Sequence, residues 1–157
     1  MRHSKWSLLL SSALVIAFAG TALATAGSGL SASTPYRGTL GASLHVNIGD
    51  MKFQTKGQVD LIDRTITFAA GATSGWHSHP GVVLIVVASG SLVRYFADCS
   101  SEVIPTGGAF VESGDDPGLV RNEGAVESVT YVTFIAPAGT TIPGLRIDKA
   151  NPGCSVQ

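Results

Sequence analysis

Nine short stretches rich in β-branched and aromatic residues, each ended by glycine, proline, asparagine or another turn residue, follow one another over residues 44–136. No stretch keeps an apolar period of about 3.6 residues with caps at both ends. Many short strands separated by turn residues are typical of a β-sandwich or a closed barrel. Nineteen glycines and only 13% charged residues fit such a body, because tight turns need glycine. The predicted strands cover residues 44–48, 51–55, 58–62, 64–69, 82–87, 91–96, 109–112, 119–122 and 128–136.

The run at residues 82–87, Val-Val-Leu-Ile-Val-Val, is apolar at every position. It is too short for a typical helix and is rich in β-branched residues, which favours a strand. Continuous apolar runs of this kind are typical of strands that are covered on both faces. We therefore predict that this strand is fully buried.

Two of the chain's four histidines, His77 and His79, stand one residue apart just before this run. On an extended strand, residues i and i+2 point to the same face, so both imidazoles are predicted to project together. Two neutral imidazoles directed at one point are the usual start of a transition-metal site. The alternative is a pair of solvated histidines at the mouth of the fold, left over from an ancestral site.

Around these histidines, the sequence resembles the first motif of the cupin superfamily, G-x5-H-x-H-x3–4-E-x6-G. Gly71, His77, His79 and Gly90 stand at the expected spacing. The glutamate position of the motif is Val83, or the next residue under the longer spacing, so the acid is absent.

A second, weaker likeness concerns the other cupin motif, G-x5-P-x-G-x2-H-x3-N, which begins here at Gly107 and ends at Asn122. The resemblance covers residues 44 to about 138, and it implies an all-β, cupin-type jelly-roll β-barrel as a single domain. The proline, glycine and histidine positions of this motif are occupied instead by Ser113, Asp115 and Gly118.

In metal-binding cupins, three histidines and one glutamate hold the metal, and this chain matches two of these positions with His77 and His79. Further ligands would have to be His45 on an early strand, Asp115 or Asp116 beside the missing third histidine, or water. The resemblance implies one divalent transition metal, Fe, Mn, Zn or Cu. A barrel without any cofactor is the equal alternative.

The N-terminus has the pattern of a secretory signal peptide, predicted here for residues 1–26. A basic start precedes an apolar run, and small residues at the end of this run offer two overlapping cleavage options. An uncleaved membrane anchor is the alternative, but such an anchor needs about 20 apolar residues. The mature protein is therefore predicted to be secreted, with an extracytoplasmic location and no membrane contact after cleavage.

The rest of the chain is predicted to be one domain with two irregular ends. Residues 27–43 are rich in Ser, Gly, Thr and Ala, which predicts a flexible leader before a cupin domain at 44–138. The tail at 139–157 has no alternating pattern of its own. Cys99 and Cys154 are the only cysteines, and an even count in an oxidising compartment favours a disulfide that pins this tail. Two free thiols are the alternative.

The charge balance argues against a nucleic-acid partner. Without Arg2 and Lys5 of the signal segment, eight basic residues remain against eleven acidic ones, a net charge of −3 with no basic stripe. The favoured function is that of a secreted cupin-fold protein that binds a small molecule in its barrel. A metal-dependent dioxygenase or isomerase using His77 and His79 is the second hypothesis, and an envelope-associated structural protein with an inactive pocket is the third. Whether the chain is an enzyme and whether it forms a homodimer stay open.

Overall fold

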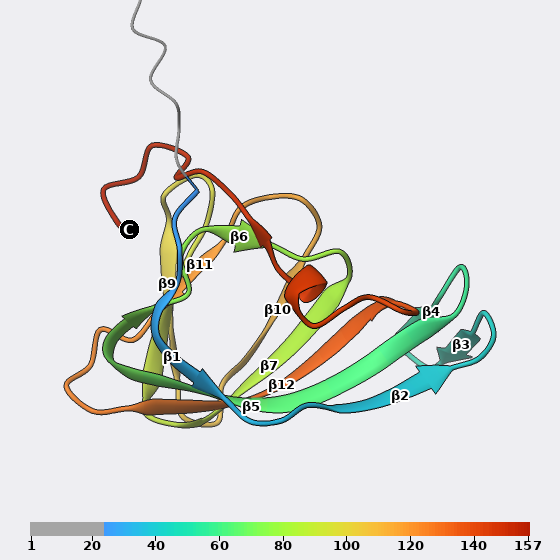
Figure 1. The fold of residues 1–157 in the computed structure, drawn as a ribbon. Helices are drawn as coiled ribbons and strands as arrows, with labels where there is room; N and C mark the ends of the chain where they lie inside the picture. The colour runs from blue at the N-terminus through green and yellow to red at the C-terminus, as the bar shows by residue number, and fades with distance from the viewer. Residues whose placement is uncertain (1–23) are drawn as a thin grey trace, which may run out of the picture.

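The computed structural model describes residues 24–157, and the predicted signal peptide lies outside the described residues except for its last three positions. Thirteen strands and one short helix make up this part of the chain (Figure 1). No helix within residues 24–157 is long and apolar enough to cross a membrane. The elements are β1 (Ser28–Ala32), β2 (Tyr36–Leu40), β3 (His45–Ile48), β4 (Met51–Gln54), β5 (Val59–Thr73), β6 (His77–Ser78), β7 (Val82–Ser89), β8 (Ser91–Tyr95), β9 (Ser101–Pro105), β10 (Ala109–Ser113), β11 (Leu119–Arg121), β12 (Ser128–Pro137), the 3-10 helix η1 (Pro143–Leu145) and β13 (Ile147–Asp148).

Most of the strands belong to one sheet, with the order β10-β7-β12-β5-β11-β8-β9 and with β1 and β2 paired to β5. The sheet curls into an almost closed barrel around the hydrophobic core (Figure 1). Side chains alternate along each strand, so every second residue enters the core. The predicted all-β barrel is thus confirmed. The core residues include Ile62, Phe68, Val83, Val87, Leu92, Phe110, Val132 and Phe134.

Strand β7 differs from the prediction of a fully buried strand. Val83, Ile85 and Val87 are buried, whereas Leu84 keeps 43% and Val86 44% of its surface exposed. The prediction is wrong because β7 is covered only on its barrel face. Its outer face, although apolar, has no layer packed over it within the described part of the chain.

The predicted flexible leader, residues 27–43, is also corrected by the structure. Its residues form β1 and β2, which pair antiparallel with β5 along the edge that β12 leaves free. An ion pair between Arg37 and Asp60 fastens β2 to β5, and the Thr39 hydroxyl donates to the same carboxylate at 2.6 Å. The prediction was wrong because backbone hydrogen bonds hold these strands, so their small, polar and mostly exposed side chains give no pattern.

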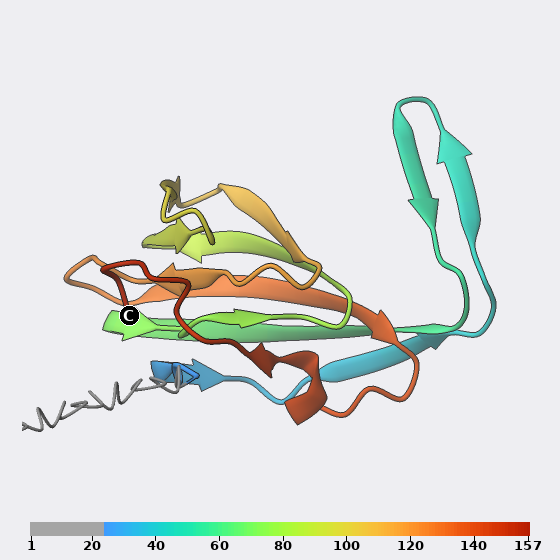
Figure 2. The same cartoon turned by 90° about the horizontal axis from the view of Figure 1, so that it is seen from above.

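Strands β3 and β4 form a separate two-stranded hairpin that stands away from the barrel (Figure 2). In its register, Val46 faces Phe53 and Ile48 faces Met51, which places these four apolar residues on one face. His45 lies on the opposite, polar face and is exposed. The hairpin therefore carries His45 away from the barrel interior.

The tail at 139–157 crosses the outside of the barrel and is fixed there. The predicted disulfide between Cys99 and Cys154 is confirmed, with Cα atoms 5.4 Å apart. The indole N–H of the buried Trp76 donates to the Val156 carbonyl at 3.3 Å. Strand β13 of the tail pairs with β6, so the tail covers the segment that carries both candidate histidines.

The last residues of the two cupin-like motifs have structural roles. Gly90 connects β7 to β8 with a φ of 75°, and a Cβ there would lie 2.8 Å from the Glu127 carbonyl oxygen. Asn122 is fully buried, and its amide donates to three backbone carbonyls at 2.7 to 3.1 Å. Both residues therefore fix loops at the ends of the strands that surround the barrel interior.

Candidate metal centre

His77 and His79 come from the short strand β6 and its end, on the inner side of the tail. Their rings lie 4.7 Å apart between centroids, with an angle of 85° between the ring planes. Both side chains are buried, at 7% and 8% exposure. The prediction that the two imidazoles project together is confirmed, because an extended backbone places residues 77 and 79 on one face.

Glu112, which the sequence analysis did not consider as a ligand, completes a group of three metal-ligating side chains. Its carboxylate and one ring nitrogen of each histidine lie within 4.8 Å of one another. Glu112 stands on β10 directly opposite Val83 of β7. Val83 is the position at which the first cupin motif has its glutamate, so the acid occurs here on the neighbouring strand. Directly opposed residues of an antiparallel pair point to the same face, so Glu112 reaches the same interior.

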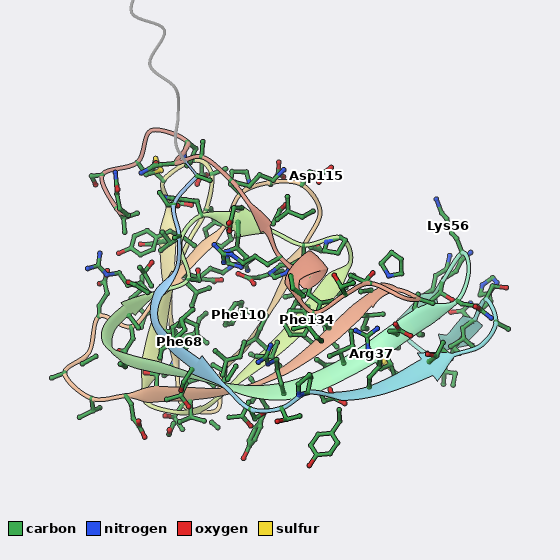
Figure 3. The ribbon with its side chains drawn as sticks, viewed as in Figure 1. Arg37, Lys56, Phe68, Phe110, Asp115 and Phe134 are labelled. Atoms are coloured by element: carbon green, nitrogen blue, oxygen red, sulfur yellow. A yellow bond between two sulfur atoms is a disulfide. The ribbon has the colours of Figure 1, made fainter. Side chains whose placement is uncertain are left out.

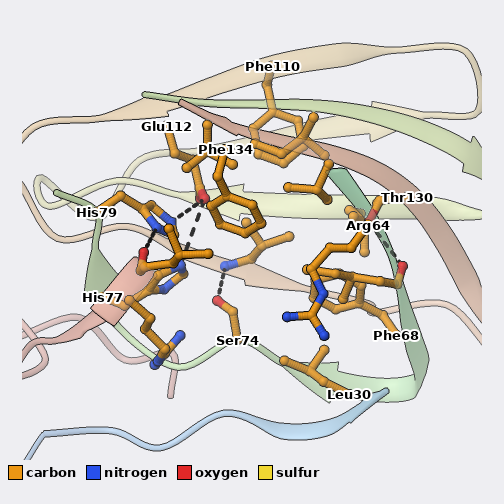
Figure 4. A pocket seen from close by; sticks show the side chains of 18 of the residues that line it. Leu30, Arg64, Phe68, Ser74, His77, His79, Phe110, Glu112, Thr130 and Phe134 are labelled. Atoms are coloured by element: carbon orange, nitrogen blue, oxygen red, sulfur yellow. Dashed lines mark hydrogen bonds and ion pairs between the residues drawn. The ribbon is translucent and has the colours of Figure 1, made fainter. Parts of the chain in front are cut away.

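Both histidines direct the same ring nitrogen at this carboxylate (Figure 4). Nε2 of His79 lies 3.1 Å from Oε2 of Glu112, and Nε2 of His77 lies 3.8 Å from the same oxygen. The second oxygen, Oε1, is buried and has no hydrogen-bond partner. One side of the carboxylate is therefore shared by two imidazoles, and the other side has an unused acceptor.

The opposite ring nitrogens are engaged by backbone carbonyls. Nδ1 of His77 lies 2.8 Å from the Gly75 carbonyl oxygen, and Nδ1 of His79 lies 2.6 Å from that of Leu145. A carbonyl only accepts, so each Nδ1 carries the proton and donates it. In the neutral imidazole, Nε2 is then an acceptor. This arrangement of an oriented imidazole with its Nδ1–H on a carbonyl is the one that metal-ligating histidines usually have.

A cation is needed at the point where these groups meet. With both Nδ1 atoms protonated, two Nε2 lone pairs and a carboxylate oxygen face one another, and acceptors at such distances repel. A second proton on an imidazole or a bound metal ion relieves this repulsion. Two imidazoles and one carboxylate are a common donor set for divalent transition metals. The residues present therefore fit a metal ion.

The surroundings also favour the protonation states that a metal requires. Burial lowers the pKa of the His77 imidazole; Glu112 opposes this shift, and Arg146 adds to it. Burial alone would raise the pKa of the Glu112 carboxyl, but the neighbouring His79 and His77 imidazoles lower it below its ordinary value. A neutral imidazole and an ionised carboxylate are the forms that bind metal ions.

The structure does not bring the other predicted ligands into this group. His45 is on the projecting hairpin, while Asp115 and Asp116 are exposed in the loop after β10, with Asp115 at the outer rim (Figure 3). Gly118, at the missing third histidine position, pairs with His77 through two backbone hydrogen bonds of 2.9 Å. A Cβ at Gly118 would lie 3.8 Å from Oε1 of Glu112. The histidine that the motif lacks would thus have started beside the unused carboxylate oxygen.

The three candidate ligands lie between two cavities. The inner one, about 280 Å³, is the barrel interior, with walls that include Phe68, Phe110 and Phe134 (Figures 3 and 4). The outer one, about 330 Å³, has a more polar lining that includes Arg94 and Asp116. Both cavities border His77, His79 and Glu112. A metal held there would be accessible from an apolar side and from a polar side.

Comparison with solved structures finds similar folds. An oxalate oxidase in complex with the substrate analogue glycolate matches with a TM-score of 0.44 and 24% identity over 48% of this chain and 42% of that one. A Cupin_2 domain of an XRE-family transcriptional regulator from Enterobacter cloacae matches with a TM-score of 0.43 and 22% identity over 49% of this chain and 82% of that one. The Schizosaccharomyces pombe Cnp3 cupin domain matches with a TM-score of 0.46 and 10% identity over 60% and 64%.

These likenesses concern the fold. The chain spans less than half of the oxalate oxidase that it matches, 42% of that chain's length. No protein-family model matches the sequence, and no curated protein matches it. The barrel is shown by the sheet of this chain itself, and its chemistry depends on its own residues.

Proposed function

We propose that this chain is an exported barrel protein that binds one divalent transition metal through His77, His79 and Glu112. In this proposal, the inner cavity takes a small molecule that reaches the metal from the apolar side. The candidates for the metal stay Fe, Mn, Zn and Cu. The proposal keeps the small-molecule partner expected from the sequence and adds Glu112 as the anionic ligand.

One observation carries this proposal: three acceptor atoms converge in a buried place while both Nδ1–H groups are used elsewhere. His79 lies 3.1 Å and His77 lies 3.8 Å from the carboxylate, and neither Nε2 atom has any other hydrogen-bond partner among residues 24–157. If these three side chains had a purely structural role, a side chain that donates a hydrogen bond would serve equally well in place of one of them. A metal ion is the partner that accepts all three lone pairs at once.

A metal-dependent enzyme is the second candidate, favoured by the number of ligands and the cavities beside them. Two histidines and one carboxylate leave coordination positions open, and such three-residue sets occur in non-haem iron oxygenases. When bound, the metal would supply Lewis-acid or redox chemistry to a molecule in the inner cavity. The chain's own residues would exclude water there, because Phe110 and Phe134 line that side.

Metal content tests the proposal directly. The full chain, expressed with export and without a histidine tag, is analysed by plasma mass spectrometry beside the His77→Ala/His79→Ala double variant and Glu112→Gln. His45→Ala is the matched control, since it removes an exposed imidazole away from the site. We expect close to one equivalent of metal in the wild type and the control, and a loss in the other two. No metal above the level of the double variant, even after soaking with each candidate metal, would refute the proposal.

Export is part of the proposal because two features agree with it. The disulfide between Cys99 and Cys154 is typical of proteins from oxidising compartments. The pattern of residues 1–26 is that of a secretory signal peptide. Homodimer formation stays a prediction, and size-exclusion chromatography with light scattering would test it.

A further inference from the structure

The barrel interior contains a second charged side chain, Arg64, which the candidate metal centre does not use. On β5, Arg64 shares the inward face with Ile62, Ile66 and Phe68, because strand residues alternate between faces. Ile62 and Phe68 are buried, and Arg64 is half-buried. Its guanidinium lines the inner cavity, in the part that lies across from His77 and His79 (Figure 4).

Arg64 has no acidic partner within residues 24–157. It takes part in none of the ion pairs there, and one terminal nitrogen donates to the Ser33 carbonyl oxygen at 3.1 Å. Its Nε is buried and has no hydrogen-bond partner. The neighbouring Asp63 points to the other face, where it accepts a hydrogen bond from the Thr133 hydroxyl.

The acid at the other end of the cavity is not a partner for Arg64 either. The carboxylate of Glu112 faces His79 at 3.1 Å and His77 at 3.8 Å, and Arg64 takes no part in this group. Arg146, which also lines the cavity, is paired with Asp148. Arg64 is therefore the cation of this cavity that is left without a counter-charge in the described part of the chain.

An inward-facing cation without an anion is costly, because partial burial removes water from the charge and the Ser33 carbonyl replaces only part of it, leaving Nε unpartnered. A guanidinium offers planar, paired N–H donors that match a carboxylate. The remaining walls are mostly hydrocarbon, from residues such as Ile66, Phe68 and Val132. A fitting occupant therefore combines one carboxylate with an apolar body.

We propose that the inner cavity binds a small apolar carboxylic acid, with its carboxylate on Arg64 and its hydrocarbon part directed toward His77 and His79. This inference rests on the proposed function, since it names the class of the small molecule in the same cavity. The volume of about 280 Å³ equals roughly nine water molecules, which suits an acid of about ten non-hydrogen atoms. Octanoate has this size and is the probe for the test.

The test measures octanoate and octanol binding to the full chain by isothermal titration calorimetry, before and after EDTA treatment. The variants are Arg64→Met, Arg64→Lys and, as a control that removes one exposed cation from the hairpin, Lys52→Met. We expect the wild type to bind octanoate roughly tenfold or more tightly than octanol, the gain of a charge-assisted pair. Arg64→Met abolishes this preference and leaves octanol binding unchanged. Arg64→Lys keeps part of the preference, and Lys52→Met keeps all of it.

Several outcomes would overturn the inference. Equal binding of octanoate and octanol, no octanoate binding at all, or an undiminished preference in Arg64→Met would each do so. Octyl sulfate bound as tightly as octanoate would remove the assignment to carboxylates. Octanoate binding that is lost with EDTA and is insensitive to Arg64 would assign the carboxylate to the metal instead.

Measurements on the same protein samples distinguish a failure of the carboxylate site from a failure of the proposed metal site. Metal content is measured on each sample, and thermal unfolding confirms that each variant is folded. A preference that depends on Arg64 in protein without metal supports the carboxylate site while the metal proposal fails. Stoichiometric metal without any effect of Arg64 gives the reverse result.

Discussion

Replacing Glu112 by glutamine distinguishes a metal ligand from one half of a structural ion pair. Nε2 of His79 lies 3.1 Å from the carboxylate, and its Nδ1 already donates to the Leu145 carbonyl oxygen. In protein without metal, the glutamine amide can donate to this Nε2, so one neutral hydrogen bond replaces the contact. Such a bond contributes about 1 kcal/mol, and a buried carboxylate is removed at the same time. We therefore expect the unfolding free energy without metal to change by no more than about 1 kcal/mol.

With metal present, the same substitution has a large effect. Losing a direct ligand should weaken binding by more than the 10- to 100-fold typical for a lost outer partner. At a metal concentration of 100 times the wild-type Kd, the metal stabilises the wild type by about 2.7 kcal/mol. A 100-fold weaker site leaves only about 0.4 kcal/mol under the same conditions. Urea unfolding at pH 7, in EDTA and in excess metal, measures both quantities.

The opposite pattern would refute the reasoning. If Glu112 and His79 were a buried structural ion pair, removing one charge would cost about 3 to 5 kcal/mol in EDTA, and metal would make no difference. Glu127→Gln is the matched control, because Glu127 is exposed in the loop before β12. It should behave as the wild type in both buffers.

Three further predictions concern the site, β5 and the disulfide. Gly118→His supplies the imidazole that is missing from the second motif, and a Cβ at this position lies 3.8 Å from Oε1 of Glu112. We therefore expect the affinity for the metal to rise about tenfold or more in a metal titration. An unchanged affinity would contradict this expectation. Hydrogen bonds from Thr39 and a backbone N–H, together with the charge of Arg37, lower the pKa of Asp60 below its ordinary 3.8. The ionised carboxylate therefore stabilises the fold above pH 3.8, and this contribution is lost as the pH falls through the lowered pKa. Asp60→Asn should therefore lower the unfolding free energy at pH 7 by an amount that shrinks below pH 3.8, as measured by urea unfolding across pH, and a constant difference would contradict the assignment. Replacing both cysteines by serine opens a loop closed over 55 residues, which should cost up to about 4 kcal/mol in urea unfolding, and unchanged stability would show that the tail is held without the bond.

The sequence was sufficient to predict the barrel and the histidine pair, because both depend on local periods. Alternation along short strands identified the β-structure, and the i, i+2 spacing placed His77 and His79 on one face. Glu112 could not be predicted in the same way, since it joins the site through its pairing opposite Val83 on another strand. The sequence held a weak indication, because Glu112 stands two residues after Phe110 on the same strand and therefore points to the same, inner face. Recognising it required the register of β10 against β7.

Other differences between the predictions from the sequence and the structure also have physical causes. The exposed outer face of β7 carries Leu84 and Val86, so an apolar run did not mean burial on both sides. Residues 27–43 form strands through backbone pairing, which composition does not reveal. The inward position of Arg64 was not predicted for a similar reason. It follows from the alternation of side chains along β5, which places Arg64 on the same face as Ile62, and not from the chemistry of arginine.

The covering tail also sets the time at which the site is completed. The carbonyl that orients His79 belongs to Leu145, 66 residues later in the chain, and the contact of Trp76 with Val156 spans 80 residues. All of these late residues follow β12, so they leave the ribosome after the last barrel strand. A growing chain therefore possesses its barrel strands before the imidazole of His79 has a fixed direction. Metal capture would accordingly come late in the maturation of each molecule, in contrast to small metal-dependent domains in which the ion directs folding from the start.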